Sequence, residues 1–97
     1  MFTRLLRFQT NIKKIDEVAT IFGENIIPLC KHQKGYLGAF FLCDRKTGDC
    51  LPMTLWETEK DMIETEESRF FQEQVVKLMS YFASPPIRES YEVIHKD

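Results

Sequence analysis

Two apolar strands joined by a polar turn occupy the stretch from Gly35 to Glu57. In the first strand, residues 36–43, both sets of alternating positions are apolar: one set is Tyr36, Phe40 and Leu42, and the other is Leu37, Ala39, Phe41 and Cys43. Successive side chains of a strand point to opposite faces of the sheet, so a strand that is apolar on both faces must be covered on both. The helices of so short a chain can cover one face of a small sheet. We therefore expect a second subunit to cover the other face.

Hydrophobic periodicity assigns the other elements. Phe2, Leu6 and Phe8 share one parity of an opening strand, and apolar residues at spacings of three and four define two helical regions. In order, the predicted elements are strand 2–10, helix 13–31, strands 36–43 and 50–57, a short helix 59–64, a longer helix 66–82 and strand 87–95. Pro28 should loosen the first helix around it, and Pro52 predicts that the third strand bends or lies at a sheet edge.

The element order β-α-β-β-α-β is that of the ferredoxin-like α+β fold, an antiparallel sheet with both helices on one face. The apolar stripes of the helices account for one face of the sheet, while the other still carries large apolar residues. Leaving such side chains in water forgoes roughly 1.5–3 kcal/mol each, against a total stability of about 5–15 kcal/mol for a small domain. The sequence therefore predicts one domain, residues 1–97, that forms a homodimer through its sheet face.

Charge and hydropathy restrict the partners of this chain. Its 13 basic and 15 acidic residues give a net charge of −2, which provides no field that would concentrate nucleic acid or anionic lipid. Arg4 and Arg7 interrupt the apolar residues of the N-terminus, so it lacks the core of a signal peptide, and no apolar run approaches membrane-spanning length. We expect a cytoplasmic protein that binds neither nucleic acid nor membrane.

The cysteines and acidic residues give no sign of a metal site. Cys30, Cys43 and Cys50 form no CxxC pair, and an odd number fits reduced, mostly buried thiols. A cross-strand disulfide or redox switch between Cys43 and Cys50 is the alternative, because they bracket the turn symmetrically. The acidic residues of segment 57–67 fit a solvated helix face, and the chain has no metal-ligand spacing or glycine-rich phosphate loop. We expect neither a metal nor a cofactor.

The central segment resembles a known family. A glycine-led strand, a D-R-x-T-G-type turn and an L-W-E strand end lead into an acidic helix in the run GYLGAFFLCDRKTGDCLPMTLWETEKDM. This pattern is similar to the central segment of the antibiotic biosynthesis monooxygenase family, within the dimeric α/β-barrel superfamily. With the helical segment 26–29, the resemblance covers residues 25 to about 71. It implies a homodimer whose two sheets pack face to face into a barrel.

The resemblance also implies a site. Trp56, the only tryptophan, matches a pocket-lining tryptophan of cofactor-independent members that oxidise polycyclic phenols. Such chemistry needs a flat apolar slot for an electron-rich ring and a polar group that favours the deprotonated substrate. Asn11 ends the first strand, where some members carry an asparagine that orients the substrate. We expect Trp56 and Asn11 to be catalytic and Tyr36, Phe40 and His32 to bind a small aromatic or quinol-type substrate.

The same residues also have structural interpretations. Trp56 suits a core position with a satisfied N–H, Asn11 suits a turn, and His32 suits the negative end of a helix dipole. The other polar candidates are Arg4, Arg7 and His95.

Two functional classes therefore remain: a cofactor-independent monooxygenase, and a non-catalytic homodimeric binding or interaction module of the same fold. Haem degradation, another oxygenase chemistry of the superfamily, asks for a histidine ligand on the second helix. This chain has no histidine between His32 and His95, which disfavours that chemistry.

Overall fold

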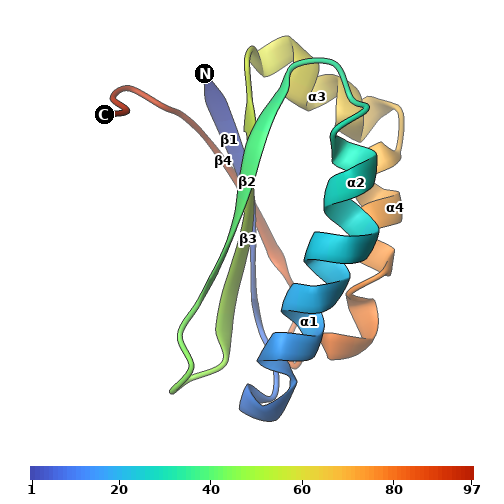
Figure 1. Cartoon of the computed structure of the whole chain (residues 1–97), viewed down its shortest axis with the longest axis vertical. Helices are drawn as coiled ribbons and strands as arrows, with labels where there is room; N and C mark the ends of the chain where they lie inside the picture. The colour runs from blue at the N-terminus through green and yellow to red at the C-terminus, as the bar shows by residue number, and fades with distance from the viewer.

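A four-stranded antiparallel sheet carries all of the helices on one of its faces (Figure 1). The computed structural model describes residues 1–97. The strands are β1 (Phe2–Gln9), β2 (Tyr36–Cys43), β3 (Asp49–Trp56) and β4 (Ile87–Glu92), in the spatial order β2-β3-β1-β4. Each helical crossover connects an inner strand to an outer one: the first runs from β1 to β2, and the second runs from β3 to β4. The predicted ferredoxin-like α+β fold is confirmed.

The first helical region is continuous but irregular. It consists of a 3₁₀ turn η1 (Ile12–Lys14), α1 (Ile15–Ile21), a π-helical turn η2 (Phe22–Ile26) and α2 (Ile27–Cys30). At the end of η2 the Ile27 N–H donates to the carbonyl of Phe22, five residues back. Pro28 follows and has no N–H to continue the regular pattern. The predicted loosening around Pro28 is therefore confirmed, in the form of a π turn.

The second helical region is divided in two. It contains α3 (Glu59–Glu67), α4 (Phe70–Val76) and a final 3₁₀ turn η3 (Met79–Tyr81). Arg69 has a φ of 69°, in the left-handed region, and a right-handed helix cannot continue through such a residue. The extents predicted for these helices, 59–64 and 66–82, are thus wrong. The right-handed helical conformation is interrupted at Arg69, so α3 ends before it and α4 begins after it.

A bulge in β2 changes which face its residues take. Between Tyr36 and Gly38, β2 holds one residue more than β3, and this extra residue shifts the alternation of side chains. Tyr36 therefore lies opposite Trp56 and packs half-buried against the core on the helix side. Phe40 faces the other side. The predicted grouping of Tyr36 with Phe40 and Leu42 on one face is wrong for this reason.

Pro52 lies in β3, which is an inner strand, so its predicted position at a sheet edge is wrong. The ladder between β1 and β3 pairs Leu5 with Met53 and Phe8 with Cys50, but contains no pairs between these two. Because proline has no N–H to donate, the ladder is interrupted where Pro52 occurs. An inner strand tolerates the proline through this local gap.

The core fills the space between the sheet and the helices. It has nine buried members: Leu6, Phe8, Ile15, Val18, Phe22, Ile26, Cys30, Cys50 and Leu78. The rings of Phe8 and Phe82 lie 4.7 Å apart, which ties β1 to the segment before β4. No helix of the structure has the length and apolar character needed to cross a membrane.

The opposite face of the sheet carries no helix (Figure 1). Phe40 is 52% exposed there and Leu42 is 45% exposed. Their register partners Met53 and Leu51, together with Leu55, are half-buried. The second apolar face that the sequence predicts thus exists, and it is uncovered in the single chain.

All three cysteines are free thiols. Cys43 and Cys50 pair directly across the hairpin, as their symmetric spacing about the turn suggested. Cys30 and Cys50 are buried and Cys43 is exposed, which agrees with the prediction of mostly buried thiols.

Candidate functional site

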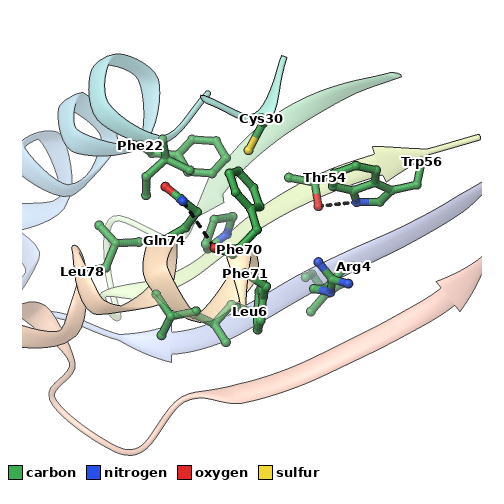
Figure 2. A pocket seen from close by; sticks show the side chains of 14 residues that line it. Arg4, Leu6, Phe22, Cys30, Thr54, Trp56, Phe70, Phe71, Gln74 and Leu78 are labelled. Carbon is green, nitrogen blue, oxygen red and sulfur yellow. Dashed lines mark hydrogen bonds between the residues drawn. The ribbon is translucent and has the colours of Figure 1, made fainter. Parts of the chain in front are cut away.

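An apolar cavity of about 60 Å³ lies between the sheet and α4 (Figure 2). Residues of β1 and β3 form one side, and residues of α4 and the first helical region form the other. Ten of its 14 lining residues are hydrophobic. For comparison, an engineered apolar cavity of about 150 Å³ is large enough to bind benzene. An aromatic ligand therefore enters only if the surrounding side chains or α4 move outward.

Trp56 forms part of the cavity wall and is 1% exposed. Alternation along β3 places it on the same face as Thr54, whose Oγ1 accepts a hydrogen bond of 2.9 Å from the indole Nε1–H. The Tyr36 ring meets the indole edge to face at a centroid distance of 5.8 Å. Because its N–H is already bonded, Trp56 offers its aromatic surface to a ligand.

Thr54, Gln74 and Cys30 add polar atoms to the lining. The Thr54 hydroxyl accepts from Trp56 and keeps its own O–H available to donate. Gln74 donates from Nε2 to the Phe70 carbonyl at 3.3 Å, and its Oε1 accepts from Lys77 Nζ at 2.8 Å.

Burial raises the pKa of the Cys30 thiol to about 11. This thiol therefore stays protonated near neutral pH and is a poor nucleophile.

Arg4 is a charged residue on the cavity wall and is only 3% exposed. Its Nη1 donates to Thr65 Oγ1 at 2.8 Å, and its Nη2 donates to Glu66 Oε2 at 2.8 Å and to the carbonyl of Met62. The guanidinium also lies 4.5 Å from the centroid of the Phe71 ring. These contacts hold one side of the guanidinium against α3 and place α4 over its face.

The Nε–H of Arg4 differs from the other donors, because it is buried without any acceptor. Burial lowers the pKa of the guanidinium, while the hydrogen bond and charge of Glu66 oppose that change. An arginine remains protonated even so. The cavity thus has a positive charge with one unused donor in its wall (Figure 2).

Asn11, predicted to act with Trp56, lies at the other end of the sheet. Trp56 pairs with Phe2 at the start of β1, whereas Asn11 follows the end of that strand. The Asn11 side chain is exposed and accepts from the Lys13 N–H at 2.9 Å, which caps η1. The structure does not bring Asn11 and Trp56 into one site.

The three predicted substrate-binding residues also lie outside the cavity lining. Tyr36 packs behind Trp56, and burial raises the pKa of its phenol. His32 is exposed in the turn after α2, and Phe40 lies on the uncovered face of the sheet. Of the five residues expected to form the site, Trp56 alone lines the cavity.

Other lining residues were recognisable from their setting in the sequence. Arg4 is the one charged residue on the parity of β1 that otherwise holds Phe2, Leu6 and Phe8. Gln74 is likewise a buried polar residue within the apolar stripe of Phe71, Val75 and Leu78. A polar side chain inside an apolar row is the signal that marks both. Thr54 has no such signal, since threonine is an ordinary strand residue.

No family model matches the sequence, and the search of curated proteins gives no match either. Solved structures, in contrast, are similar along nearly the whole chain. One is the monooxygenase from the gene ActVA-Orf6 of Streptomyces coelicolor, in complex with the ligand nanaomycin D: 11% identity, a TM-score of 0.80, and coverage of 99% of this chain and 89% of that one.

Two further structures have comparable similarity. A mutant of SnoaB, a cofactor-independent oxygenase from Streptomyces nogalater, has 11% identity and a TM-score of 0.73, with 98% of this chain and 94% of that chain covered. A protein of unknown function from Nitrosomonas europaea has 14% identity and a TM-score of 0.74, with 99% and 91% covered. At such identities the similarity shows the fold. The chain has the fold found in antibiotic biosynthesis monooxygenases, as the central motifs predicted.

Proposed function

We propose that this protein is a cofactor-independent monooxygenase that oxidises a small aromatic or quinol-type substrate beside Trp56. The observation that supports the proposal is the apolar cavity under α4, which has an indole in its wall and a few polar groups among its lining residues. Sites for small ligands have this composition. Two proteins of the same fold are named as a monooxygenase and a cofactor-independent oxygenase.

The proposed substrate is a phenol with an unsubstituted para carbon. With O₂ it yields a para-quinone and water. One oxygen atom bonds to the para carbon, and the other leaves as water with the hydrogens of the phenol O–H and the para C–H. The indole of Trp56 packs against such a ring, and the apolar walls keep bulk water from it. Since the cavity is about 60 Å³, the surrounding side chains or α4 must move outward when the ring binds.

Oxygen uptake in the presence of a panel of phenols and 1-naphthols with an unsubstituted para carbon tests the proposed activity. We expect turnover with at least one compound, and we expect Trp56→Phe to lower kcat/KM about tenfold or more, because the smaller ring loses roughly 1–2 kcal/mol of contacts. Phe40→Leu is the control, since this ring lies on the other face of the sheet. If no compound is turned over, and Trp56→Phe leaves stability and ligand binding unchanged, the enzyme proposal fails.

A non-catalytic binding module is the second candidate, and the surroundings of Trp56 favour it. The indole is 1% exposed and its N–H is satisfied by Thr54, as in a residue that serves packing alone. Binding of aromatic ligands without oxygen uptake would support this candidate over the monooxygenase.

For either function we propose a homodimer through the uncovered face of the sheet. The centre of this face is apolar, and Phe40 and Leu42 are about half exposed on it. The one close ion pair on the face, Arg7 Nε to Glu89 Oε1 at 3.1 Å, is electrically balanced, so it adds no net charge that would repel a second copy. Such a face suits contact between two identical surfaces.

Sedimentation at micromolar concentration tests the dimer. We expect the wild type to be dimeric and Phe40→Glu to be monomeric, because the new carboxylate would be buried without a partner. Val76→Glu places the same charge on the exposed outer surface of α4, where Val76 is 59% exposed, and should remain dimeric. A wild-type chain that sediments as a stable monomer would contradict the proposal.

A further inference from the structure

Arg4 is an unusual residue to find inside a small apolar core. Arginine is almost never fully buried unless its charge is paired, because removing the charge from water is costly. Here the side chain of Arg4 is only 3% exposed. Thr65, Met62 and Glu66 together accept three of its N–H groups, all from α3. The structure has therefore provided acceptors on one side of the group only.

One N–H donor on the remaining side of the guanidinium has no acceptor. The Nε–H of Arg4 lies buried without an acceptor, and leaving such a group unsatisfied is rare in folded proteins. Arg4 also lines the cavity, so the unpaired donor belongs to a side chain at the wall of the space that a ligand would enter. A ligand oxygen that reached the Nε–H would supply the missing acceptor.

The charges around Arg4 favour an anion as that acceptor. Glu66 contacts two arginines, Arg4 Nη2 at 2.8 Å through Oε2 and Arg88 Nη1 at 2.5 Å through Oε1. One carboxylate thus serves two guanidinium groups, which leaves an excess of positive charge. Both guanidinium groups also lie over the Phe71 ring, at 4.5 Å and 5.9 Å from its centroid. The Phe71 ring and the positively charged guanidinium of Arg4 therefore lie side by side in the cavity wall (Figure 2).

We infer that Arg4 is the residue that selects the ligand, by donating its unpaired Nε–H to the ionised oxygen of a planar phenolate. The ring of the ligand occupies the apolar part of the cavity beside Trp56, and its oxygen faces the guanidinium. The free O–H of Thr54, which lines the same cavity, is a second donor for this oxygen. This inference rests on the proposed function, and it adds that the ligand binds in its ionised form.

The choice of phenolate over phenol has a measurable consequence. A cation within about 4–6 Å of an acid lowers the pKa of that acid by about 1–3 units. A phenol bound against Arg4 should therefore ionise at lower pH than the same phenol in water. A residue that only joins β1 to α3 would have no effect on the ionisation of a ligand.

The test uses 4-nitrophenol, whose phenolate absorbs visible light, and 4-nitroanisole, its uncharged methyl ether. With the wild-type protein we expect the phenolate to bind about tenfold or more tightly than the ether, and the bound phenol to titrate about one unit or more below its value in water. Arg4→Lys retains a cation for Glu66 but lacks the Nε–H, and should reduce the preference for the phenolate about tenfold. Arg7→Met, on the uncovered face of the sheet, is the matched control and should change neither value.

Glu66→Gln tests the same inference without altering Arg4. Removing the carboxylate leaves the positive charge less neutralised, so the phenolate should bind more tightly while binding of the ether stays the same. Equal binding of both compounds to the wild type, with no change in the pKa of the bound phenol, would overturn the role of Arg4 and leave the cavity as a site for neutral rings. Failure of both compounds to bind would overturn the inference together with the proposed function.

Discussion

Replacing Gly48 by alanine should destabilise the fold more than its small size suggests. Gly48 has a φ of 85°, and a Cβ added there would collide with the carbonyl oxygen of Thr10. The left-handed conformation alone costs a residue with a side chain about 1–2 kcal/mol. The Thr10 carbonyl cannot move away cheaply, because the Thr10 N–H donates to the Gly48 carbonyl at 2.9 Å and pins the hairpin turn to the end of β1.

The expected loss combines these terms. Alanine reduces the freedom of the unfolded chain and so regains about 0.4–1 kcal/mol. The strain and the collision together exceed this gain, and we expect a net loss of about 2 kcal/mol or more. For a domain of this size, 1 kcal/mol corresponds to about 4–8 °C in Tm, so Gly48→Ala should lower the Tm by about 10 °C or more.

Gly23→Ala is the matched control for the same chemical change. A Cβ at this position meets nothing within 4 Å, and the residue lies in the helical region. Alanine there should stabilise the protein by roughly 0.5–1 kcal/mol. Both variants are followed by circular dichroism and Trp56 fluorescence at one protein concentration, because dimerisation makes Tm depend on concentration. If Gly48→Ala melts within a few degrees of the wild type, the argument from backbone strain and collision is refuted.

Two further predictions concern titratable groups. In the folded protein a thiol reagent should modify Cys43 and spare Cys30 and Cys50, which are buried and whose pKa values burial raises to about 11; counting three reactive thiols under native conditions would contradict this assignment. Asp16 has its pKa lowered by the hydrogen bond and charge of Arg45, so the pair stabilises the folded state above the unfolded-state pKa of Asp and ceases to do so as pH falls through the lower folded-state value. Asp16→Asn should therefore reduce stability slightly at about pH 7 and not at about pH 2 in urea unfolding, and an equal loss at both would count against the pairing.

The order and type of the strands followed from sequence periodicity, because apolar residues recur at alternate positions along strands and at spacings of three and four along helices. The errors arose where backbone geometry, which periodicity does not report, decides the outcome. Arg69 takes a left-handed conformation and divides one expected helix, although nothing in its chemistry demands it. The extra residue at the start of β2 reverses the face of Tyr36, since strand parity holds only for an unbroken register.

The site was harder to predict than the fold. Trp56 was identified through a motif, and it does line the cavity. Asn11 and Trp56 each lie at the C-terminal end of a strand, β1 and β3. Because these two strands are antiparallel, the two residues lie at opposite ends of the sheet and do not share a site. From the sequence, Arg4 is one polar candidate among several. Its burial and unpaired donor depend on contacts with α3, some sixty residues away, which no local pattern records.

The bulge at the start of β2 also makes the register of this strand matter as much as its composition. In a regular strand of the same length, Leu37 would face the helices and Tyr36 would face outward, which would leave the indole of Trp56 without its aromatic neighbour. Deletion of Leu37, in contrast, would restore a regular register and keep Tyr36 opposite Trp56. Related sequences of the same length that lack the bulge should therefore differ in the shape of their cavity and in the surface they present to a second subunit, even where their residues are alike.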